Sequence, residues 1–268
     1  MPASDMRRPP VVRVRGLHKY YGDEHIIRGV DLDIRPGEVF ALAGPSGTGK
    51  STFLRCLNFL LPFSAGTVEI AGITVGARES LDERSRQIRQ IRLRAAMVFQ
   101  DFNLFPHLTI LDNVIRAAIA VKKVPEAQAK ARGETLLDRA GLYARRFDYP
   151  GRLSSGEQQQ VAIARSLCME PDVILFDDPT SALDPGLAGE LAATMKRLSQ
   201  EGIAMLIVSN VPALIRSVAD WVIFMDGGVW QEITPPQLIF SSPKKERTRR
   251  FFEHIMLKNG GAEGQGRR

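Results

Sequence analysis

The feature that most constrains the fold is a glycine-rich loop between two apolar segments. It reads Gly44-Pro45-Ser46-Gly47-Thr48-Gly49-Lys50-Ser51-Thr52. An apolar run at 39–43 precedes it, and an amphipathic run at 53–61 follows it. In a strand–loop–helix of this kind, successive backbone N–H groups converge on phosphate oxygens at the helix N-terminus. A plain glycine-rich connector is the alternative, but it does not account for the Gly-Lys-Ser at this offset.

The same loop carries the side chains that a nucleoside triphosphate needs. Lys50 would reach the β- and γ-phosphates, and the Ser51 hydroxyl would bind Mg²⁺. Further along, an apolar strand at 173–177 ends in Asp177, where an α/β nucleotide fold places its Mg²⁺-organising carboxylate. Asp178 follows directly. Two adjacent carboxylates near a triphosphate are costly unless Mg²⁺ compensates them, so the pair favours a metal-dependent nucleotide site over a simple helix cap.

The rest of the chain alternates strands with helices. Uniformly apolar strands at 173–177 and 204–208 alternate with helices at 161–167 and 187–200, and this order indicates a parallel sheet covered on both faces. Alternating patterns predict strands at 11–15 and 30–34, joined through a polar turn at 18–23 with two exposed aromatics. A helical insertion is expected from 100 to about 154, with Asp112 capping a helix at 113–121 and Pro125 starting another. Segments 221–225 and 229–233 flank a hairpin turn.

Composition narrows the partners only a little. The net charge of +6 suits an anionic partner but equally a surface beside anionic lipid. The arginine-rich helix expected at 84–94 lacks interleaved aromatics, which favours a solvated face over nucleic-acid binding. No apolar run approaches the roughly 18 residues of a membrane span, and the first ten residues do not resemble a signal peptide. Cys56 and Cys168 are too few for a disulfide framework or a zinc site, so a cytosolic location is expected.

These motifs together resemble the nucleotide-binding subunits of ATP-binding cassette (ABC) transporters, from about residue 11 to 252. Segments 100–107, 176–185, 235–240 and 246–249 are most similar to the polar amino-acid importer subfamily. The resemblance implies an α/β P-loop NTPase with a mainly parallel central sheet, an antiparallel β subdomain and an inserted α-helical subdomain. It implies one nucleotide-binding domain at 11–258, with a core at 11–99 and 161–258 and a helical subdomain at 100–160. The glycine-rich end at 259–268 is expected to be disordered.

The resemblance also assigns roles to residues outside the loop. Tyr21 would stack on adenine, Gln100 would sense Mg²⁺ and link the site to the membrane partner, and Asp184 would signal across a subunit interface. The signature segment, which would contact the γ-phosphate bound by a second subunit, contains Ser154, Ser155, Gly156 and Glu157. The implied cofactors are ATP and Mg²⁺. The implied partners are transmembrane permease subunits, a second identical or different nucleotide-binding subunit and, indirectly, a solute-binding protein, at the cytoplasmic face of the membrane. Nucleic acid is not expected as a partner.

Several positions depart from the family pattern. Asp178 stands where a glutamate usually polarises the attacking water, and Asn210 stands where a histidine is usual. A carboxylate one methylene shorter reaches about 1.5 Å less far, and a misplacement of that order can cost about a hundredfold in rate. In the signature segment, Ser155 replaces Gly, Glu157 replaces Gln and Gln160 replaces Arg. We therefore expect a subunit that binds ATP normally and hydrolyses it slowly.

Three functions remain open on the sequence. The first is the motor subunit of an importer, with weakened hydrolysis. The second is a hydrolysis-deficient, ATP-gated regulatory or partner cassette in a heterodimeric complex. The third, a cassette protein of DNA repair or translation, is disfavoured because such proteins carry two cassettes or a long coiled-coil insertion. Residues 100–111 are expected to receive a helix of the membrane subunit through exposed Phe102, Leu104, Phe105 and Pro106, unless these side chains form the core of the helical lobe.

Overall fold

The computed structural model describes residues 9–77, 80–180 and 183–260, and it contains two sheets. The central sheet has the strand order β10-β9-β3-β8-β7-β6, and the smaller one has the order β2-β1-β4-β5. The central strands are β3 (Val39–Ala43), β6 (Ala95–Val98), β7 (Val173–Asp177), β8 (Ala204–Val208), β9 (Trp221–Asp226) and β10 (Val229–Thr234). The strands of the smaller sheet are β1 (Val12–Tyr21), β2 (Glu24–Ile34), β4 (Ala65–Ile70) and β5 (Ile73–Gly76).

The central sheet is parallel except for its β10 edge. Strands β9, β3, β8, β7 and β6 pair in parallel, and β10 returns antiparallel to β9 through the Gly227–Gly228 turn. Every residue of β3, β7 and β8 is buried, as the uniformly apolar sequences predict. The smaller sheet is antiparallel throughout. The predicted fold class is confirmed.

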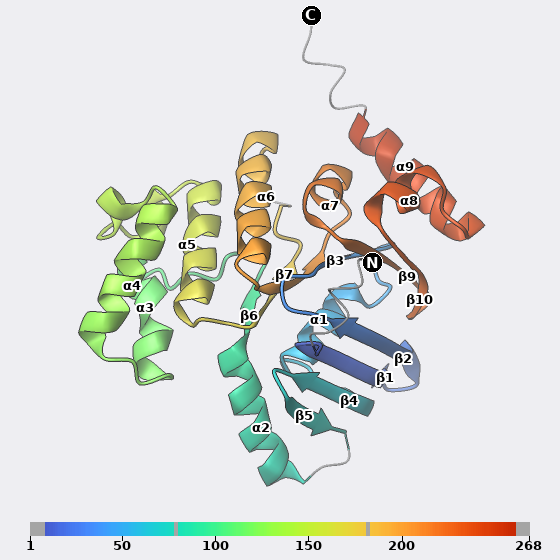
Figure 1. Ribbon diagram of the computed structural model, residues 1–268, viewed down its shortest axis with the longest axis horizontal. Helices are drawn as coiled ribbons and strands as arrows, with labels where there is room; N and C mark the ends of the chain where they lie inside the picture. Colours follow the sequence, from blue (N-terminus) through green and yellow to red (C-terminus); the bar gives the residue numbers. More distant parts are fainter. Residues whose placement is uncertain (1–8, 78–79, 181–182, 261–268) are drawn as a thin grey trace, which may run out of the picture.

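Helices cover the central sheet on both faces (Figure 1). The helices are α1 (Lys50–Leu57), α2 (Leu81–Arg94), α3 (Ile110–Ala120), α4 (Glu126–Arg139), α5 (Ser155–Cys168), α6 (Pro185–Gln200), α7 (Pro212–Val218), α8 (Pro236–Ser241) and α9 (Glu246–Gly260). On one face, Phe53 and Leu54 of α1 pack between the two sheets, against Val14 of β1 and Leu206 of β8. On the other face, α6 and α7 pack their apolar residues against β7 and β8. Helix α1 is therefore fixed from both sides, which holds the loop before it.

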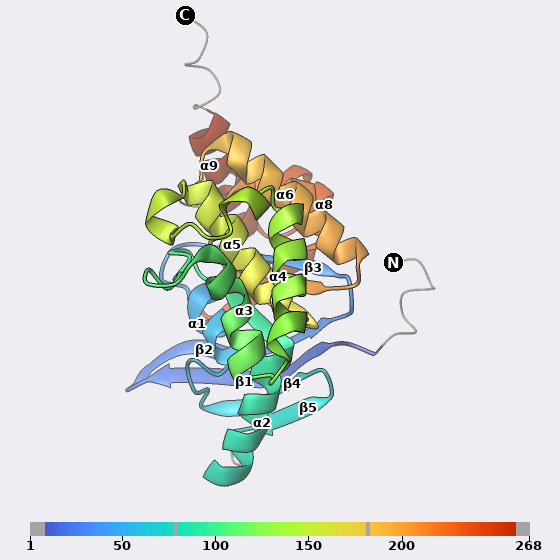
Figure 2. The same cartoon turned by 90° about the vertical axis from the view of Figure 1, so that its left-hand side faces the viewer.

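Helices α3, α4 and α5 form a lobe beside the sheet, which faces the viewer in Figure 2. They share a separate apolar core that includes Ile115, Ala129 and Val161. Gly133 of α4 allows α3 and α4 to approach closely, because a Cβ at this position would lie 2.4 Å from Ile115. Helix α5 runs without a break through residue 160, the position at which the sequence predicts the end of the helical subdomain.

Three local predictions are corrected by the structure. Residues 18–21 belong to β1 and not to a turn, because they continue the pairing with β2 as far as Tyr21. Asp112 does not cap α3; the cap is Thr109, whose hydroxyl accepts from the Asp112 N–H at 3.1 Å. Residues 259 and 260, expected to be disordered, belong to α9, which extends to Gly260. Residues 261–268, and residues 1–8 of the N-terminal segment, lie outside the described residues.

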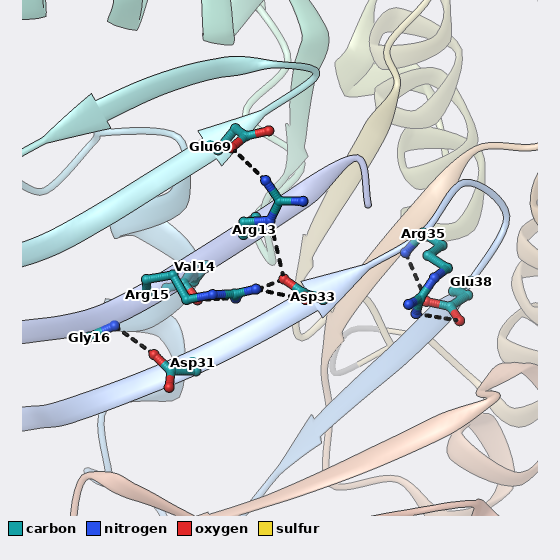
Figure 3. A network of polar contacts seen from close by, with 9 residues as sticks. All are labelled: Arg13, Val14, Arg15, Gly16, Asp31, Asp33, Arg35, Glu38 and Glu69. Carbon is teal, nitrogen blue, oxygen red and sulfur yellow. Dashed lines mark hydrogen bonds and ion pairs between the residues drawn. The ribbon is translucent and has the colours of Figure 1, made fainter. Parts of the chain in front are cut away.

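Ion pairs across the smaller sheet hold β1 in register with its two neighbours (Figure 3). Arg15 of β1 donates two hydrogen bonds of 2.8 Å to Asp33 of β2. Arg13, two residues earlier, donates to Glu69 of β4 at 3.1 Å. Exposed pairs of this kind each contribute well under about 1 kcal/mol, but opposite charges facing each other disfavour a slipped pairing. The register matters because the β1–β2 hairpin carries Tyr21.

Candidate nucleotide site

The predicted site residues gather at one edge of the central sheet, where the parallel strands end. The glycine loop follows β3, Asp177 is the last residue of β7, and Asn210 lies two residues beyond β8. The loop is more than 120 residues from Asp177 and Asn210 in the sequence. Strands β7 and β3 both pair with β8, however, so the three strand ends are neighbours. This edge of an open α/β sheet is where ligands bind.

Glycine is required at the start of the loop by the closeness of another backbone. A Cβ on Gly44 would lie 2.1 Å from the carbonyl oxygen of Met225 in β9. At the other end of the loop, Gly49 has φ +98° and immediately precedes α1. The left-handed conformation at that position favours glycine. The loop therefore wraps closely enough for its backbone N–H groups to line the N-terminus of α1.

Lys50, the first residue of α1, points back into the loop. Its Nζ donates to the carbonyl oxygens of Gly44 at 2.8 Å and Pro45 at 2.6 Å. Burial lowers the pKa of the Lys50 ammonium, and the carboxylates of Asp178 and Asp177 partly oppose this shift. Among the described residues, the hydrogen bonds of this partly desolvated cation go to two neutral carbonyls. It is well placed to bind an anion, because phosphate oxygens are far stronger acceptors for its charge.

Ser51 and Asp177 meet, although they are far apart in the sequence. The Ser51 hydroxyl donates to Asp177 Oδ1 at 2.7 Å, and Arg55 of α1 donates to Asp177 Oδ2 at 3.1 Å. Asp177 is almost fully buried. A hydroxyl and a carboxylate form the kind of oxygen donor set that Mg²⁺ prefers when phosphates and water complete its octahedron. The residues present therefore fit Mg²⁺. The described part of the chain has no cluster of three or more His, Cys, Asp or Glu that could hold a metal without the nucleotide.

Asp178 occupies an unusual backbone conformation beside this pair. Its φ is +49°, and its N–H donates to the Val208 carbonyl at 3.0 Å. Burial raises the pKa of the Asp178 carboxyl, the charge of Asp177 adds to the rise, and Lys50 opposes it. Asp tolerates the left-handed region better than most residues. The backbone therefore gives a reason for Asp at this position that is independent of hydrolysis.

Asn210 contacts the loop directly. Its Oδ1 accepts from the Gly44 N–H at 3.1 Å, and its Nδ2 donates to the Gly44 carbonyl at 3.1 Å. The sequence resemblance places Asn210 opposite the γ-phosphate. In the structure, the whole carboxamide is engaged with the backbone of the loop.

The signature segment begins helix α5 and is itself well ordered by hydrogen bonds. Ser154 is the N-cap: its hydroxyl accepts from the Glu157 N–H, and the Glu157 carboxylate accepts from the Ser154 N–H at 2.8 Å. Arg145 donates to the other carboxylate oxygen. The Ser154 N–H, followed by Arg145, lowers the pKa of the Glu157 carboxyl. The negative charge of Glu157 is thus neutralised within its own lobe. It is less of an obstacle to a phosphate than the sequence indicates.

The two middle residues of this segment are half-buried Ser155 and buried Gly156. A Cβ on Gly156 would lie 2.5 Å from Leu187 of α6, so glycine is needed for the close contact between α5 and α6. Asp184 caps α6 by accepting from the Leu187 N–H at 2.9 Å. Ser181 and Ala182, part of the segment that resembles the amino-acid importers, lie outside the described residues.

Two predicted residues stand apart from the loop. Tyr21 lies at the end of the β1–β2 hairpin with 47% of its surface exposed, and Lys19 Nζ lies 4.6 Å from its ring centroid. Gln100 follows β6 and is exposed, and among the described residues it makes no hydrogen bond. Both side chains are accessible to a ligand or partner.

A contact that the sequence did not predict links α5 to the loop after Gln100. Arg165 donates to the carbonyl oxygens of Phe102 at 2.7 Å and Asn103 at 2.6 Å. Phe102 and Asn103 have φ of +59° and +49°, a strained conformation for two adjacent non-glycine residues. Burial lowers the pKa of the Arg165 guanidinium. An arginine within the apolar run 161–167 was the available signal.

Replacing Arg165 by Met is expected to lower the free energy of unfolding by about 2 kcal/mol, because two charge-assisted hydrogen bonds to strained backbone are lost. Amide hydrogen exchange at residues 100–104 should accelerate more than exchange elsewhere. Urea denaturation and exchange measured by mass spectrometry check both effects. Arg116→Met, on an exposed face of α3, is the matched control and should change neither. Equal effects of the two substitutions would contradict the assignment.

The predicted docking residues divide into two groups. Phe102 and Leu104 pack against the apolar cores, as the alternative interpretation expects. Phe105, with 46% of its surface exposed, and exposed Pro106 remain on the surface. Buried Asn113 shapes this segment, accepting from the Phe105 N–H at 2.7 Å and donating to the carbonyls of Phe105, Leu108 and Thr109. The exposed aromatic is therefore held on a rigid loop.

A cleft lies at the opposite edge of the sheet. It encloses about 460 Å³ between α4, the end of α5 and the start of β8. Its charges are already paired, Arg132 with Glu170 at 3.0 Å and Arg139 with Glu201 at 3.8 Å. A triphosphate needs uncompensated donors, which the glycine loop supplies and this cleft does not.

The sequence is similar to known proteins of one family. A family model described as ABC transporter matches residues 27–181. The chain is 46% identical over 246 residues to the L-cystine transport system ATP-binding protein TcyN of Escherichia coli (strain K12), covering 92% of this chain and 98% of that protein. It is 42% identical over 240 residues to the glutamine transport ATP-binding protein GlnQ of Geobacillus stearothermophilus, covering 90% and 97%.

Solved structures agree with the sequence relatives. The ATP-binding cassette MJ0796, solved as a dimer in a post-hydrolysis state bound to ADP and Pi, has a TM-score of 0.72 and 30% identity, covering 84% of this chain and 98% of that one. The cbiO1 protein from Clostridium perfringens, part of the ABC transporter complex cbiONQ, has a TM-score of 0.77 and 27% identity, covering 95% and 99%. Within the described residues, no helix is long and apolar enough to cross a membrane.

Proposed function

The chain belongs to the ATP-binding proteins of the ABC transporter family, and from this premise we propose that it is the ATP-binding subunit of an importer for polar amino acids, with weakened hydrolysis. The observation that supports an ATP site is the arrangement at the strand ends. Lys50 donates into the glycine loop there, and Ser51 donates to Asp177. The solute class is supported by the relatives, whose names specify transport of cystine, glutamine and arginine.

The residues of this chain divide the work of binding among them. Lys50 would leave the two carbonyls of the loop for the β- and γ-phosphates, with the backbone N–H groups of residues 46–52 donating alongside it. Ser51 and Asp177 would hold Mg²⁺, which supplies charge neutralisation for the phosphates when bound. The exposed ring of Tyr21 would stack on adenine.

Hydrolysis would depend on Asp178 and on a second subunit. Asp178 would orient the attacking water and accept its proton, with a carboxylate one methylene shorter than the usual glutamate. Ser154, Ser155 and the N-terminal N–H groups of α5 would face the γ-phosphate bound by the partner cassette, with Asp184 beside the same interface. Ser155 in place of a glycine crowds that approach. These departures support slow turnover with unimpaired capture of ATP.

The proposed partners are transmembrane permease subunits, a second cassette and, through the permease, a solute-binding protein. The proposed location is the cytoplasmic face of the membrane, where the chain would be a peripheral subunit. Gln100 and the exposed part of residues 101–106 support the docking of a permease helix. A rigid loop presenting a half-exposed Phe105 is the kind of anchor on which interface energy concentrates.

Phe105→Glu is expected to abolish co-purification with the permease subunits, because a charge in an apolar contact costs several kcal/mol when buried. The measurement is affinity capture of the co-expressed complex from detergent-solubilised membranes, with ATP binding by the free subunit as a check on folding. Phe147→Glu, on an exposed aromatic in the loop before the signature segment, is the matched control and should leave recovery unchanged. Unchanged recovery of the Phe105 variant would overturn the docking assignment.

The second candidate is the hydrolysis-deficient, ATP-gated regulatory or partner cassette. It is favoured by Asp178 and Asn210 together, since neither side chain reproduces the usual group. Turnover separates the two candidates. The importer motor hydrolyses ATP slowly once assembled with its permease, whereas the regulatory cassette hydrolyses none in any assembly made from this chain alone.

A further inference from the structure

We propose that Asn210 is a positioning residue that holds Gly44, the first residue of the phosphate loop, in place for any nucleotide, with or without a γ-phosphate. The inference rests on the proposed function, because it concerns the same nucleotide site. It assigns Asn210 a different task from the histidine usual at this position, which would act on the γ-phosphate. The task is to keep the loop in the same conformation before and after the nucleotide binds.

The geometry is that of a carboxamide paired with one residue's backbone. Asn210 Oδ1 accepts from the Gly44 N–H and Nδ2 donates to the Gly44 carbonyl, both at 3.1 Å. Two paired strands exchange hydrogen bonds through one residue in the same way. The asparagine carboxamide is suited to this because its donor and acceptor sit on one carbon. An imidazole carries its two nitrogens on different sides of the ring and cannot match both groups at once.

The opposite side of Gly44 is closed by another strand. A Cβ on Gly44 would lie 2.1 Å from the Met225 carbonyl oxygen, so this peptide has β9 against it and Asn210 on its polar edge. Gly44 is fully buried and Asn210 half-buried. A buried peptide that loses its partners is destabilised by the desolvation of both groups. The contact with Asn210 therefore supplies hydrogen-bond partners for the buried N–H and carbonyl of Gly44.

The Gly44 carbonyl oxygen accepts from two donors, Asn210 Nδ2 and Lys50 Nζ. Lys50 Nζ donates to the same oxygen at 2.8 Å. When Lys50 turns to the phosphates, that oxygen loses the lysine and keeps Asn210. The loop thus retains its shape at the moment when its lysine leaves. This benefit is the same for a diphosphate as for a triphosphate, because the Gly44 peptide is the same in both complexes.

The test is equilibrium binding of Mg²⁺–ADP and of a non-hydrolysable ATP analogue to the purified chain, measured by calorimetry. Asn210→Ala is expected to weaken both nucleotides by a similar factor, about tenfold, the size of one or two lost hydrogen bonds. Asn210→His is expected to weaken ADP as much as Asn210→Ala does. Ser209→Ala is the matched control, because its hydroxyl only accepts from the Val211 N–H at 3.1 Å and does not touch the loop.

Three results would overturn the proposal. A loss confined to the ATP analogue would make Asn210 a γ-phosphate sensor. Affinities equal to those of the parent chain, in variants whose unfolding midpoints are also unchanged, would show that the contact does not position the loop. A loss in Ser209→Ala as large as in Asn210→Ala would trace the effect to this segment in general. If the parent chain itself binds neither nucleotide, it is the proposed function that fails, so the two failures are distinguishable.

Discussion

Replacing Asp178 by Glu is expected to raise the ATP turnover of the assembled transporter by about a hundredfold, because the added methylene moves the carboxylate toward the water that must be polarised. The rise should appear in kcat, with little change in the ATP concentration at half-saturation, since Lys50 and Ser51 hold the phosphates in both proteins. Steady-state hydrolysis by the reconstituted complex measures it. Asp178→Asn should lower turnover below that of the parent, because an amide cannot accept the proton.

The matched control lies at the opposite end of the same strand. Asp172 precedes β7, and Arg94 donates to its carboxylate at 3.2 Å, so Asp172→Glu adds the same methylene far from the site. It should leave turnover unchanged. Asp178→Glu should also lower the free energy of unfolding by about 0.5–1 kcal/mol, since Glu tolerates the left-handed backbone at 178 less well than Asp. A rate that stays at the parental value in a folded Asp178→Glu complex contradicts the hypothesis of weakened hydrolysis.

Replacing Lys50 by Ala is expected to weaken ATP binding by about a hundredfold or more. It removes the one ammonium that, among the described residues, donates to carbonyl oxygens of the glycine loop. The variant should remain folded, since the Gly44 carbonyl keeps Asn210 as a donor. Calorimetric titration with Mg²⁺–ATP gives the affinity, and circular dichroism checks the fold.

Lys122→Ala provides the control for Lys50→Ala. Lys122 is also a partly buried lysine whose pKa is lowered by burial, and its Nζ donates to a carbonyl oxygen, that of Met169. It lies on the helical lobe, after α3, and should leave ATP affinity unchanged. If Lys50→Ala binds ATP as tightly as Lys122→Ala, the glycine loop is not the phosphate site.

Much of the site could be predicted because it is encoded locally. The residue types at fixed offsets in the loop 44–52 predict a phosphate site. Asp177 ends an apolar strand, which predicts that its carboxylate lies at the edge of the sheet. Parallel strands present their carboxyl ends at one edge of a sheet, so these two predictions also imply that the groups meet. The hydroxyl of Ser51 and the carboxylate of Asp177 do meet, at 2.7 Å.

Other features could not be predicted because they depend on the direction of side chains in the packed protein. Glu157 reads in the sequence as an unfavourable negative charge, but Arg145 and the Ser154 N–H neutralise it. Arg165 reads as one more arginine on a helix, but the fold turns it toward the loop carbonyls of Phe102 and Asn103. Such pairings follow from the rotation of a helix on its neighbours, which periodicity describes only as a face.

By itself the sequence determined the fold class, the phosphate loop and the family. These depend on local patterns, namely the apolar periodicity of each strand or helix and the spacing of residues within one motif. Only the tertiary structure decided the backbone conformation of Asp178 and the hydrogen-bond partners of Asn210 at that edge. Asp178, with φ +49°, lies where the ends of β7 and β8 are paired. The contact of Asn210 with Gly44, 166 residues away, lies where β8 and β9 flank β3. The physical reason is that hydrogen bonds between distant segments require both partners to be placed within a few tenths of an ångström. Packing of the whole sheet, and no local pattern, supplies that placement.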